Sequence, residues 1–354
     1  MKAYINGIGA VSPQNTLDKD HFLDDVTAVE TPFLQIQKPD YKAFIDPRVL
    51  RRMSKIVRMS IVAANTALNE AGITKPEAII TSTGMGCQAD TEKFLNAVID
   101  NNEELLNPTA FIQSTHNTMG AQIALMQSNN CYNLTYVNRG FSFESALLDS
   151  LMLINEGEAK NLLLGGIDEI TEESWLISTK TGKYKANPLN NLSLLNDQQQ
   201  GALSGEGANF FVLSRKKSVN SYACISGIDT FYNPENEKVV EDKIKRFLRK
   251  KGLNIKDIDL VILGYNGNPT LDGVYSHVEN SVFTENAIAY FKHLSGEYDT
   301  AVSFATWLAA KVLKTGIVPG IVQKRKYTGS TPKKVLIYNH LRNIYHSLIL
   351  LEKV

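Results

Sequence analysis

The sequence lacks several features that would point to a functional class. Its 354 residues carry 37 basic and 37 acidic side chains, so no net charge draws the chain to nucleic acid or anionic lipid. Its three cysteines (Cys87, Cys131 and Cys224) include no CxxC pair, so no disulfide or zinc framework is indicated. No apolar run approaches the ~20 residues of a membrane-spanning helix, and the N-terminus has no signal-peptide core. We therefore expect a cytoplasmic protein without a metal, a cofactor, a nucleic-acid partner or a membrane partner.

The sequence does contain an alternation of short apolar runs with longer helical patterns, which favours βαβ units around a buried sheet. The predicted helices are Lys55–Ala71, Glu144–Glu156 and Val240–Lys251. The predicted strands are Ala3–Ile8, Ala78–Thr81, Leu134–Val137, Leu162–Gly165, Phe210–Leu213, Ala223–Ile228, Leu260–Leu263, Val335–Tyr338 and Ser347–Leu351.

The two halves of the chain resemble each other weakly. Each opens on a strand that contains glycine (YINGIG, CISGID), continues through a small-residue turn into an apolar helix, and closes on an apolar strand. This predicts a duplicated fold with halves at 1–216 and 217–354. The polar, Asn/Gln-rich segment 188–207 reads as a surface excursion.

A glycine occupies the turn of a strand–turn–helix pattern in which a reactive side chain is expected. Residues 132–166 read as strand, sharp turn, helix and strand, with Arg139-Gly140-Phe141 at the turn. A cysteine there would lie at a helix N-terminus, where its pKa would fall and a thiolate would form. Gly140 supplies no such atom, so the framework of a covalent-catalysis site has lost its nucleophile.

The same turn allows a second interpretation. Residues 140–144 come close to a G-x-S-x-G nucleophile elbow with Ser142 at its centre. The last glycine is replaced by Glu144, which would crowd the tight turn. A hydrolase or acyltransferase that uses Ser142 therefore stays open as the alternative.

Five segments, in order, resemble the thiolase-fold β-ketoacyl-ACP synthases over nearly the whole chain. They are INGIGAVSP, RRMSKIVRMSIVAANTALNEAGI, NPTAFIQSTHNTMGAQIA, LLLGGIDEIT and SGEGANFFVLSRK. The resemblance implies an α/β fold of the thiolase type, with duplicated halves in five αβαβα layers.

The resemblance also assigns site positions. Gly140 stands at the catalytic cysteine, Asn266 replaces the histidine that opens an HGTGT motif, and His293 matches the second catalytic histidine. A lysine five residues before that histidine becomes Ile288, and the Gly-rich gate loop becomes Leu341–Ile344. Condensation needs a covalent acyl carrier and groups that hold the enolate, so we expect these losses to abolish it.

Several interpretations remain open beside these. His293 is either a surviving catalytic group or a packed structural histidine. Phe141, Phe143 and Arg139 either plug a vacated pocket or belong to an ordinary core. The basic clusters at Arg51–Arg58 and Lys243–Lys256 are either solvated faces or docking sites for an acidic carrier protein.

The functional expectation follows from the resemblance. A ketosynthase-like chain without condensing machinery is similar to the chain-length factors of type II fatty acid or polyketide synthesis, including aryl polyene pathways. The resemblance implies a homodimer, or a heterodimer with an active ketosynthase, with an acyl carrier protein as a further partner. We expect no condensing activity, and the alternative is a divergent 3-oxoacyl-ACP synthase, acyltransferase or hydrolase.

Overall fold

The computed structural model describes residues 1–18 and 21–354 and is built around an 11-stranded sheet. The strand order is β13-β12-β11-β14-β15-β10-β1-β9-β6-β4-β5, and β1 pairs with β10 in the middle. The sheet strands are β1 (Ala3–Val11), β4 (Ala78–Ser82), β5 (Tyr132–Tyr136), β6 (Asn161–Asp168), β9 (Gly207–Ser214), β10 (Ala223–Tyr232), β11 (Leu260–Leu263), β12 (Ala287–Tyr290), β13 (Gln323–Arg325), β14 (Lys334–Leu341) and β15 (Tyr345–Glu352).

The strand order itself is duplicated. Within β1, β4, β5, β6 and β9, the order from the centre outwards is first, fifth, fourth, second and third. Strands β10, β11, β12, β14 and β15 follow the same order on the other side of the centre. The duplicated fold is thus confirmed, while the boundary between residues 216 and 217 stays a prediction.

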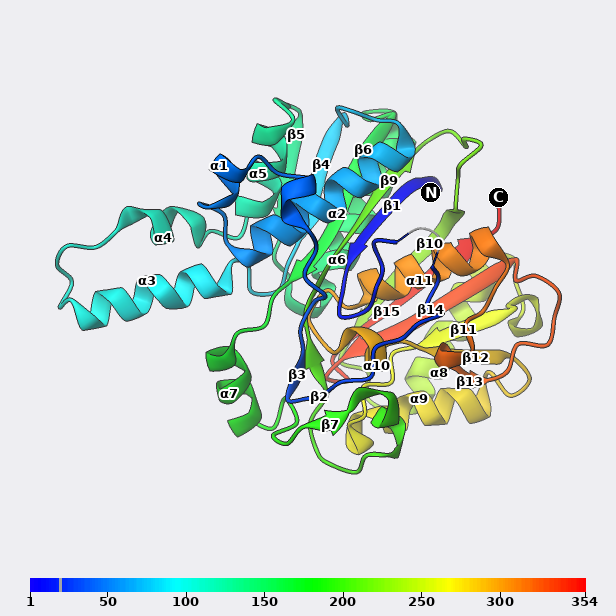
Figure 1. Ribbon diagram of the computed structural model, residues 1–354. Coiled ribbons are helices and arrows are strands. Elements are labelled where there is room, and N and C mark those ends of the chain that lie inside the picture. The colour runs from blue at the N-terminus through cyan, green and yellow to red at the C-terminus, as the bar shows by residue number, and fades with distance from the viewer. Residues whose placement is uncertain (19–20) are drawn as a thin grey trace.

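Helices pack on both outer faces of the sheet, and others pack between its two halves (Figure 1). The helices are α1 (Pro47–Leu50), α2 (Lys55–Ala71), α3 (Gln88–Asp100), α4 (Pro108–Gln113), α5 (Thr118–Met126), α6 (Ser142–Glu156), α7 (Glu172–Lys180), α8 (Glu237–Lys250), α9 (Pro269–Ser281), α10 (Lys292–Ser295) and α11 (Val302–Thr315).

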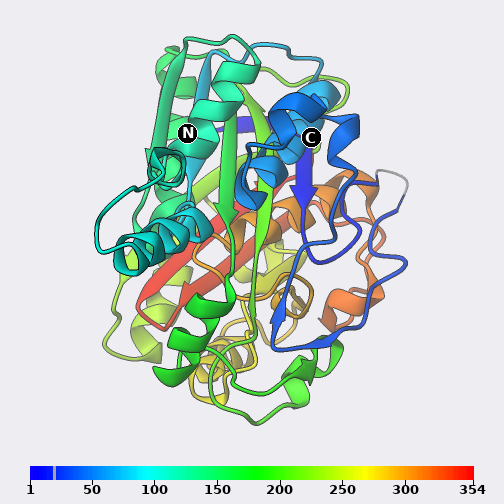
Figure 2. The same ribbon diagram turned by 60° about the vertical axis from the view of Figure 1, so that its left-hand side comes forward.

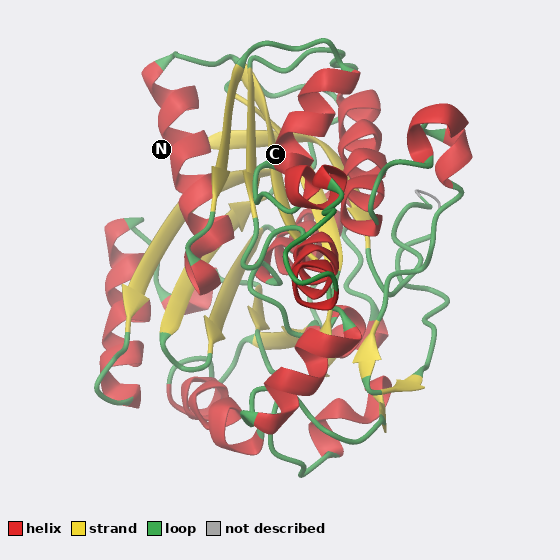
Figure 3. Cartoon of the chain, turned by 90° about the vertical axis from the view of Figure 1, so that its left-hand side faces the viewer, coloured by secondary structure: helices red, strands yellow, loops and turns green. Residues whose placement is uncertain are grey.

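Three apolar cores define five layers, which Figure 3 shows as helices on either side of the strands. One core joins α2 to β1, β4, β6 and β9, and another joins α8 and α9 to β11, β14 and β15. Between them, α6 and α11 pack against strands of both halves. The α/β five-layer architecture expected from the resemblance is therefore present.

Residue type explains why α11 and α2 take these places. Every residue of α11 from Val302 to Leu313 is buried, as a helix packed between strands of both halves of the sheet requires. Helix α2 lies so close to β1 that an added Cβ at Gly9 would stand 2.0 Å from the carbonyl oxygen of Ala63. Glycine in β1 is what permits this approach.

Three segments differ from the sequence expectations. Strands β12 and β13 were not predicted, because AIAY and QKR contain no continuous run of β-branched or aromatic residues. The segment 188–207 is not only a surface excursion: it forms the short strands β7 (Leu189–Asn190) and β8 (Ser204–Gly205), which pair with β2 (Glu30–Thr31) and β3 (Phe33–Leu34). Within the described residues, no helix is long and apolar enough to cross a membrane.

Candidate functional site

The sharp turn between β5 and α6 is present, and its centre is filled by other side chains. A short 3₁₀ helix, Arg139–Phe141, leads from β5 into α6, and Gly140 is buried within it. A Cβ built on Gly140 would lie 2.8 Å from Leu341 Cβ and 2.9 Å from Tyr345 Cβ. Such distances are well below ordinary carbon contacts, so the space that a nucleophile would need is occupied.

The occupying residues come from the β14–β15 hairpin. Within its three-residue loop, Arg342 and Asn343 have φ of 58° and 53°, the left-handed geometry of a tight turn, and the N–H of Ile344 donates to the carbonyl of Leu341 at 3.1 Å. The segment Leu341–Ile344, which the resemblance aligned with a Gly-rich gate, is therefore a closed turn. Tyr345 also meets Phe141 edge-on, with ring centroids 5.0 Å apart.

The three residues that the sequence suggested as a plug of the pocket, Phe141, Phe143 and Arg139, have different surroundings. Phe143 is fully buried in the central core, where its ring lies 5.9 Å from that of Phe211. Arg139 is exposed, with a left-handed φ of 47°. Only Phe141 covers the turn, beside Tyr345.

The hydroxyl of Ser142 is engaged by the backbone of the turn. It donates to the carbonyl of Arg139 at 2.7 Å and accepts from the N–H of Asn138 at 2.8 Å. Ser142 is fully buried, and its two hydrogen bonds orient the turn. A nucleophilic serine needs a base beside it, and these partners are not bases.

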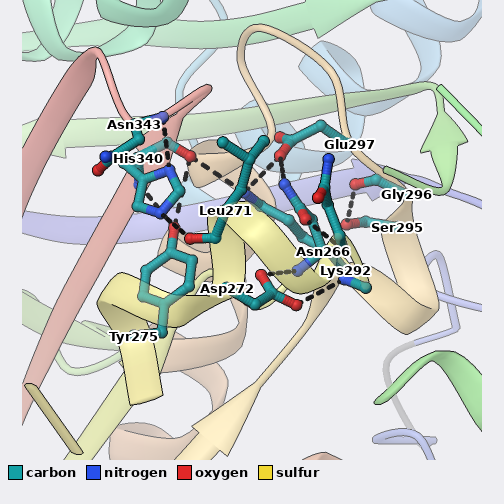
Figure 4. Close-up of polar contacts among 12 residues, drawn as sticks. Asn266, Leu271, Asp272, Tyr275, Lys292, Ser295, Gly296, Glu297, His340 and Asn343 are labelled. Carbon is teal, nitrogen blue, oxygen red and sulfur yellow. Dashed lines mark hydrogen bonds and ion pairs between the residues drawn. The ribbon is translucent and has the colours of Figure 1, made fainter. Parts of the chain in front are cut away.

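A cluster of buried polar side chains also contacts this hairpin (Figure 4). Lys292 Nζ is 2.8 Å from Glu297 Oε2, and the amide of Asn266 donates to the same oxygen at 2.8 Å. The three residues are 0 %, 3 % and 1 % exposed, respectively. Lys292 Nζ also reaches the carbonyl of His340 at 3.4 Å, which joins this cluster to the hairpin.

The backbone around Asn266 is fixed by one carboxylate. Asp272 accepts from the N–H groups of Asn266 and Gly267 at 3.0 and 2.8 Å. Burial raises the pKa of Asp272 to about 6, although these two hydrogen bonds oppose the shift. The Asn266 side chain is held at both ends, since its oxygen accepts from the N–H of Asn268 and its nitrogen donates to Glu297.

A further carboxylate lies behind the sharp turn. Glu144, in the first turn of α6, is 2 % exposed, and neither of its oxygens has a hydrogen-bond partner among the described residues. Burial raises its pKa to about 7, while Ser347 and the Lys292 ammonium lower it. Lys292 therefore acts electrostatically on carboxylates from two elements.

The remaining residues named by the resemblance lie outside the cluster. The His293 imidazole packs on Tyr290, with centroids 4.0 Å apart, and its Nε2 contacts the carbonyl of Ile321 at 3.1 Å. Burial lowers the pKa of His293 to about 3, so the ring is neutral and Nε2–H donates. Ile288 is buried in the outer core with α8 and α9.

The structure adds residues that sequence reasoning did not select. Lys292 and Glu297 form the centre of the cluster, and their five-residue spacing equals the one expected between the family's lysine and histidine. His340 is buried on the ring of Tyr275, with centroids 4.3 Å apart, and burial holds its pKa well below the usual range. No motif marked His340, whereas the spacing of Lys292 and Glu297 was visible in the sequence.

Taken together, the site has polar groups but no reactive atom at the turn. Within the described residues, histidine, cysteine and carboxylate side chains form no group of three that would hold a metal ion. The Lys292 ammonium is paired with one oxygen of Glu297, and Asp272 accepts from two backbone N–H groups, all in a buried interior. This arrangement can stabilise the fold and orient the hairpin.

Comparison by sequence identifies the family. The family described as "Beta-ketoacyl synthase, N-terminal domain" matches residues 28–218. The chain therefore belongs to the beta-ketoacyl synthase family. A search of the curated proteins finds no match.

Comparison by structure finds the same fold over the full length. The chain is similar to "The ishigamide ketosynthase/chain length factor", with a TM-score of 0.82, 17% identity and coverage of 100% of this chain and 99% of that chain. It is also similar to a beta-ketoacyl synthase from Burkholderia phymatum, with a TM-score of 0.81, 14% identity and the same coverage. A type II polyketide synthase acyl-carrier protein in complex with its ketosynthase bound to the hexaketide matches with a TM-score of 0.77, 14% identity and the same coverage.

Proposed function

We propose that this chain is a non-catalytic ketosynthase-like subunit that pairs with an active beta-ketoacyl synthase in type II fatty acid or polyketide synthesis. The observation that carries the proposal is the filled turn at Gly140. Leu341 and Tyr345 occupy the place of a nucleophile, so the loss extends beyond one residue to the shape of the site. A single reversion to cysteine would not fit without a movement of the hairpin.

The positions of Lys292 and Glu297 along the chain support the same proposal. Lys292 and Glu297 lie four residues after the positions that the resemblance assigned to Ile288 and His293. They keep the five-residue spacing, and both face Asn266 (Figure 4). We therefore take Lys292 as the retained lysine and Glu297 as the replacement of the second histidine. A carboxylate cannot donate the hydrogen bonds of an imidazolium, so the condensing site would be further disabled.

The edge of the sheet offers a surface for a partner. Strand β5 is the outermost strand on its side of the sheet, and Tyr132 and Leu134 on it are 48 % and 37 % exposed. Exposed apolar residues continue onto α5 and α6, at Leu125, Leu148 and Met152. A free strand edge with apolar neighbours favours pairing with another chain. We assign this face to the dimer contact.

The α3–α4 arm extends the same face. Figures 1 and 2 show α3 and α4 projecting from the body, and α4 leads into α5 beside β5. Three apolar side chains of the arm, Leu105, Phe111 and Ile112, are 99 %, 56 % and 65 % exposed. An arm of this kind would cover part of the partner, where its side chains would limit the length of a growing chain, as in a chain-length factor.

A basic face would serve a carrier protein. The C-terminal part of α8 and the following turn expose Arg246, Arg249, Lys250, Lys251 and Lys256. Carrier proteins are acidic, and complementary charge accelerates and orients such encounters. We propose this face, rather than Arg51–Arg58 at the base of the arm, as the carrier contact.

Co-expression with a ketosynthase encoded beside this chain tests the proposal. We expect a one-to-one complex on size exclusion, and we expect Leu134→Lys to weaken it by about tenfold or more, because a charge would enter an apolar contact. Ile177→Lys on α7 is the matched control, since Ile177 is 64 % exposed and away from β5. A chain that forms no complex, or that loses it equally with both variants, contradicts the proposal.

A further inference from the structure

A short segment crosses over the turn that carries Asn266. It comprises residues 189–200, which we call the strap: strand β7, the 3₁₀ helix Asn191–Asn196 and the four residues after it. Figure 1 shows it beside α9, below the central layers. The strap was expected to be a solvated surface loop, yet Leu189, Asn191 and Leu194 are buried.

The first contact of the strap is made by Leu194. A Cβ built on Gly267 would lie 2.3 Å from Leu194 Cδ1, so this leucine lies directly on the turn after Asn266. Gly267 has φ of 79°, and glycine suits both the backbone and the close approach. Leu194 therefore closes the outer side of the polar cluster.

The second contact is a buried ammonium. Lys185 is fully buried, and its Nζ lies 2.7 Å from Asp197 Oδ2, 2.6 Å from the carbonyl of Gln199 and 2.7 Å from the carbonyl of Gly267. The ammonium thus donates hydrogen bonds to two carbonyls and forms an ion pair with the Asp197 carboxylate. Two of the acceptors belong to the strap and one to the turn, so Lys185 ties the two segments together.

The strap has further contacts with the body of the protein. Leu194 and Leu189 form a small apolar cluster with Leu34 and Leu203, while Leu192 and Leu195 pack against the central and outer cores. The side-chain amide of Asn191 donates to the carbonyl of His293 at 2.7 Å, and β7 pairs with β2. A cavity of about 220 Å³ remains between the strap and the start of α9, and Asp272 lines it. Opening the strap alone would leave the three cores assembled, so it would cost less free energy than global unfolding.

From these contacts we propose that the strap is a lid over the Asn266–Lys292–Glu297 cluster and that Lys185 is the positioning residue that holds it closed. In the closed state, Leu194 on Gly267 keeps solvent and ligands from the turn. When the Lys185 contacts are lost, the strap lifts and the turn at Gly267 becomes accessible from the cavity beside Asp272. The proposed opening and closing take place within this chain, so the proposal does not depend on a partner protein.

Hydrogen exchange followed by mass spectrometry on the full chain tests it. In Lys185→Met we expect the amides of residues 190–203 and 265–268 to exchange about tenfold faster or more, with β9 and β10 unchanged. Lys324→Met is the matched control, because Lys324 lines the same cavity but binds Glu279 at 2.7 Å instead of the strap. Wild-type exchange of the strap in a folded Lys185→Met protein overturns the proposal.

A second variant keeps the test decisive if Lys185→Met does not fold. Leu194→Ala leaves all three partners of the ammonium in place and removes only the contact with Gly267. We expect faster exchange, about threefold or more, confined to the strap and the turn. Unchanged exchange there, or an equal increase throughout the chain, overturns the proposal.

Discussion

The turn at Gly140 and the cluster around Lys292 both contact the β14–β15 hairpin, and they differ in how their interiors are filled. At the turn, apolar side chains occupy the space where a reactive group would stand. At the cluster, buried charges remain and pair with one another. The comparison teaches that one hairpin can pack against an apolar turn and also against a charged cluster, because buried charges that are paired cost less than unpaired ones.

The largest effect is expected from removing the ammonium of Lys292 from the buried polar cluster. Lys292→Met leaves Glu297 buried without its cation, and we expect a loss of about 3 to 5 kcal/mol in the free energy of unfolding, measured by urea denaturation. Lys324→Met is the control: its side chain is 33 % exposed, and a loss of about 1 kcal/mol is expected. Equal, small losses from both variants would show that Lys292 and Glu297 do not form a buried pair.

A double-mutant cycle tests whether the turn at Gly140 is packed against Leu341 of the hairpin. Leu341→Ala removes buried volume at a cost of about 2 to 4 kcal/mol, and Gly140→Ala forces a Cβ against Leu341 at a cost of about 1 to 3 kcal/mol. The double variant should recover about 1 kcal/mol or more relative to the sum, because the new methyl enters the space that leucine left.

The control for this cycle is Gly273→Ala in α9, where an added Cβ meets nothing within 4 Å. That change should stabilise the helix by up to about 1 kcal/mol, since alanine is the better helix former. Strict additivity of the Gly140 and Leu341 changes would mean that the turn is not packed against the hairpin.

A smaller effect is expected from the pH dependence of Glu144. Its pKa rises from 4.5 to about 7 on folding, so the folded state holds the proton more tightly and stability is lost as pH rises through this window. Glu144→Gln removes the ionisation, and the variant should gain about 2 to 3 kcal/mol over the wild type between pH 4 and pH 8. The measurement is chemical unfolding of both proteins at these two pH values. A constant difference would mean that Glu144 has an ordinary pKa in the folded chain.

The sequence predicted much of the fold because its elements have strong local signals. Helix Lys55–Ala71 was predicted with its observed bounds, as its apolar stripe and the following Gly72 mark it clearly. Every predicted strand has a counterpart in the structure. The strap was predicted to be a surface segment because its composition is polar on average. Composition does not show that individual residues in it, such as Leu194 and Asn191, are buried.

The site was predictable only in part, for a geometric reason. Gly140 and Asn266 were visible from the motifs that surround them. His293 looked like the retained histidine, but neighbouring residues of a short helix point in different directions, and Lys292 faces the cluster instead. The closing hairpin was beyond sequence reasoning, because Leu341 and Tyr345 lie about 200 residues from Gly140 along the chain.

The measurement that tests the central claim most directly is the intact mass of the wild-type chain after incubation with an acyl-ACP thioester and, separately, with cerulenin. An active ketosynthase carried through the same incubation should gain the mass of the acyl group or of cerulenin. For this chain we predict an unchanged mass, because the turn has no nucleophile and Leu341 and Tyr345 fill its place. An adduct that maps to Ser142, or to any other side chain of the turn, would contradict the account.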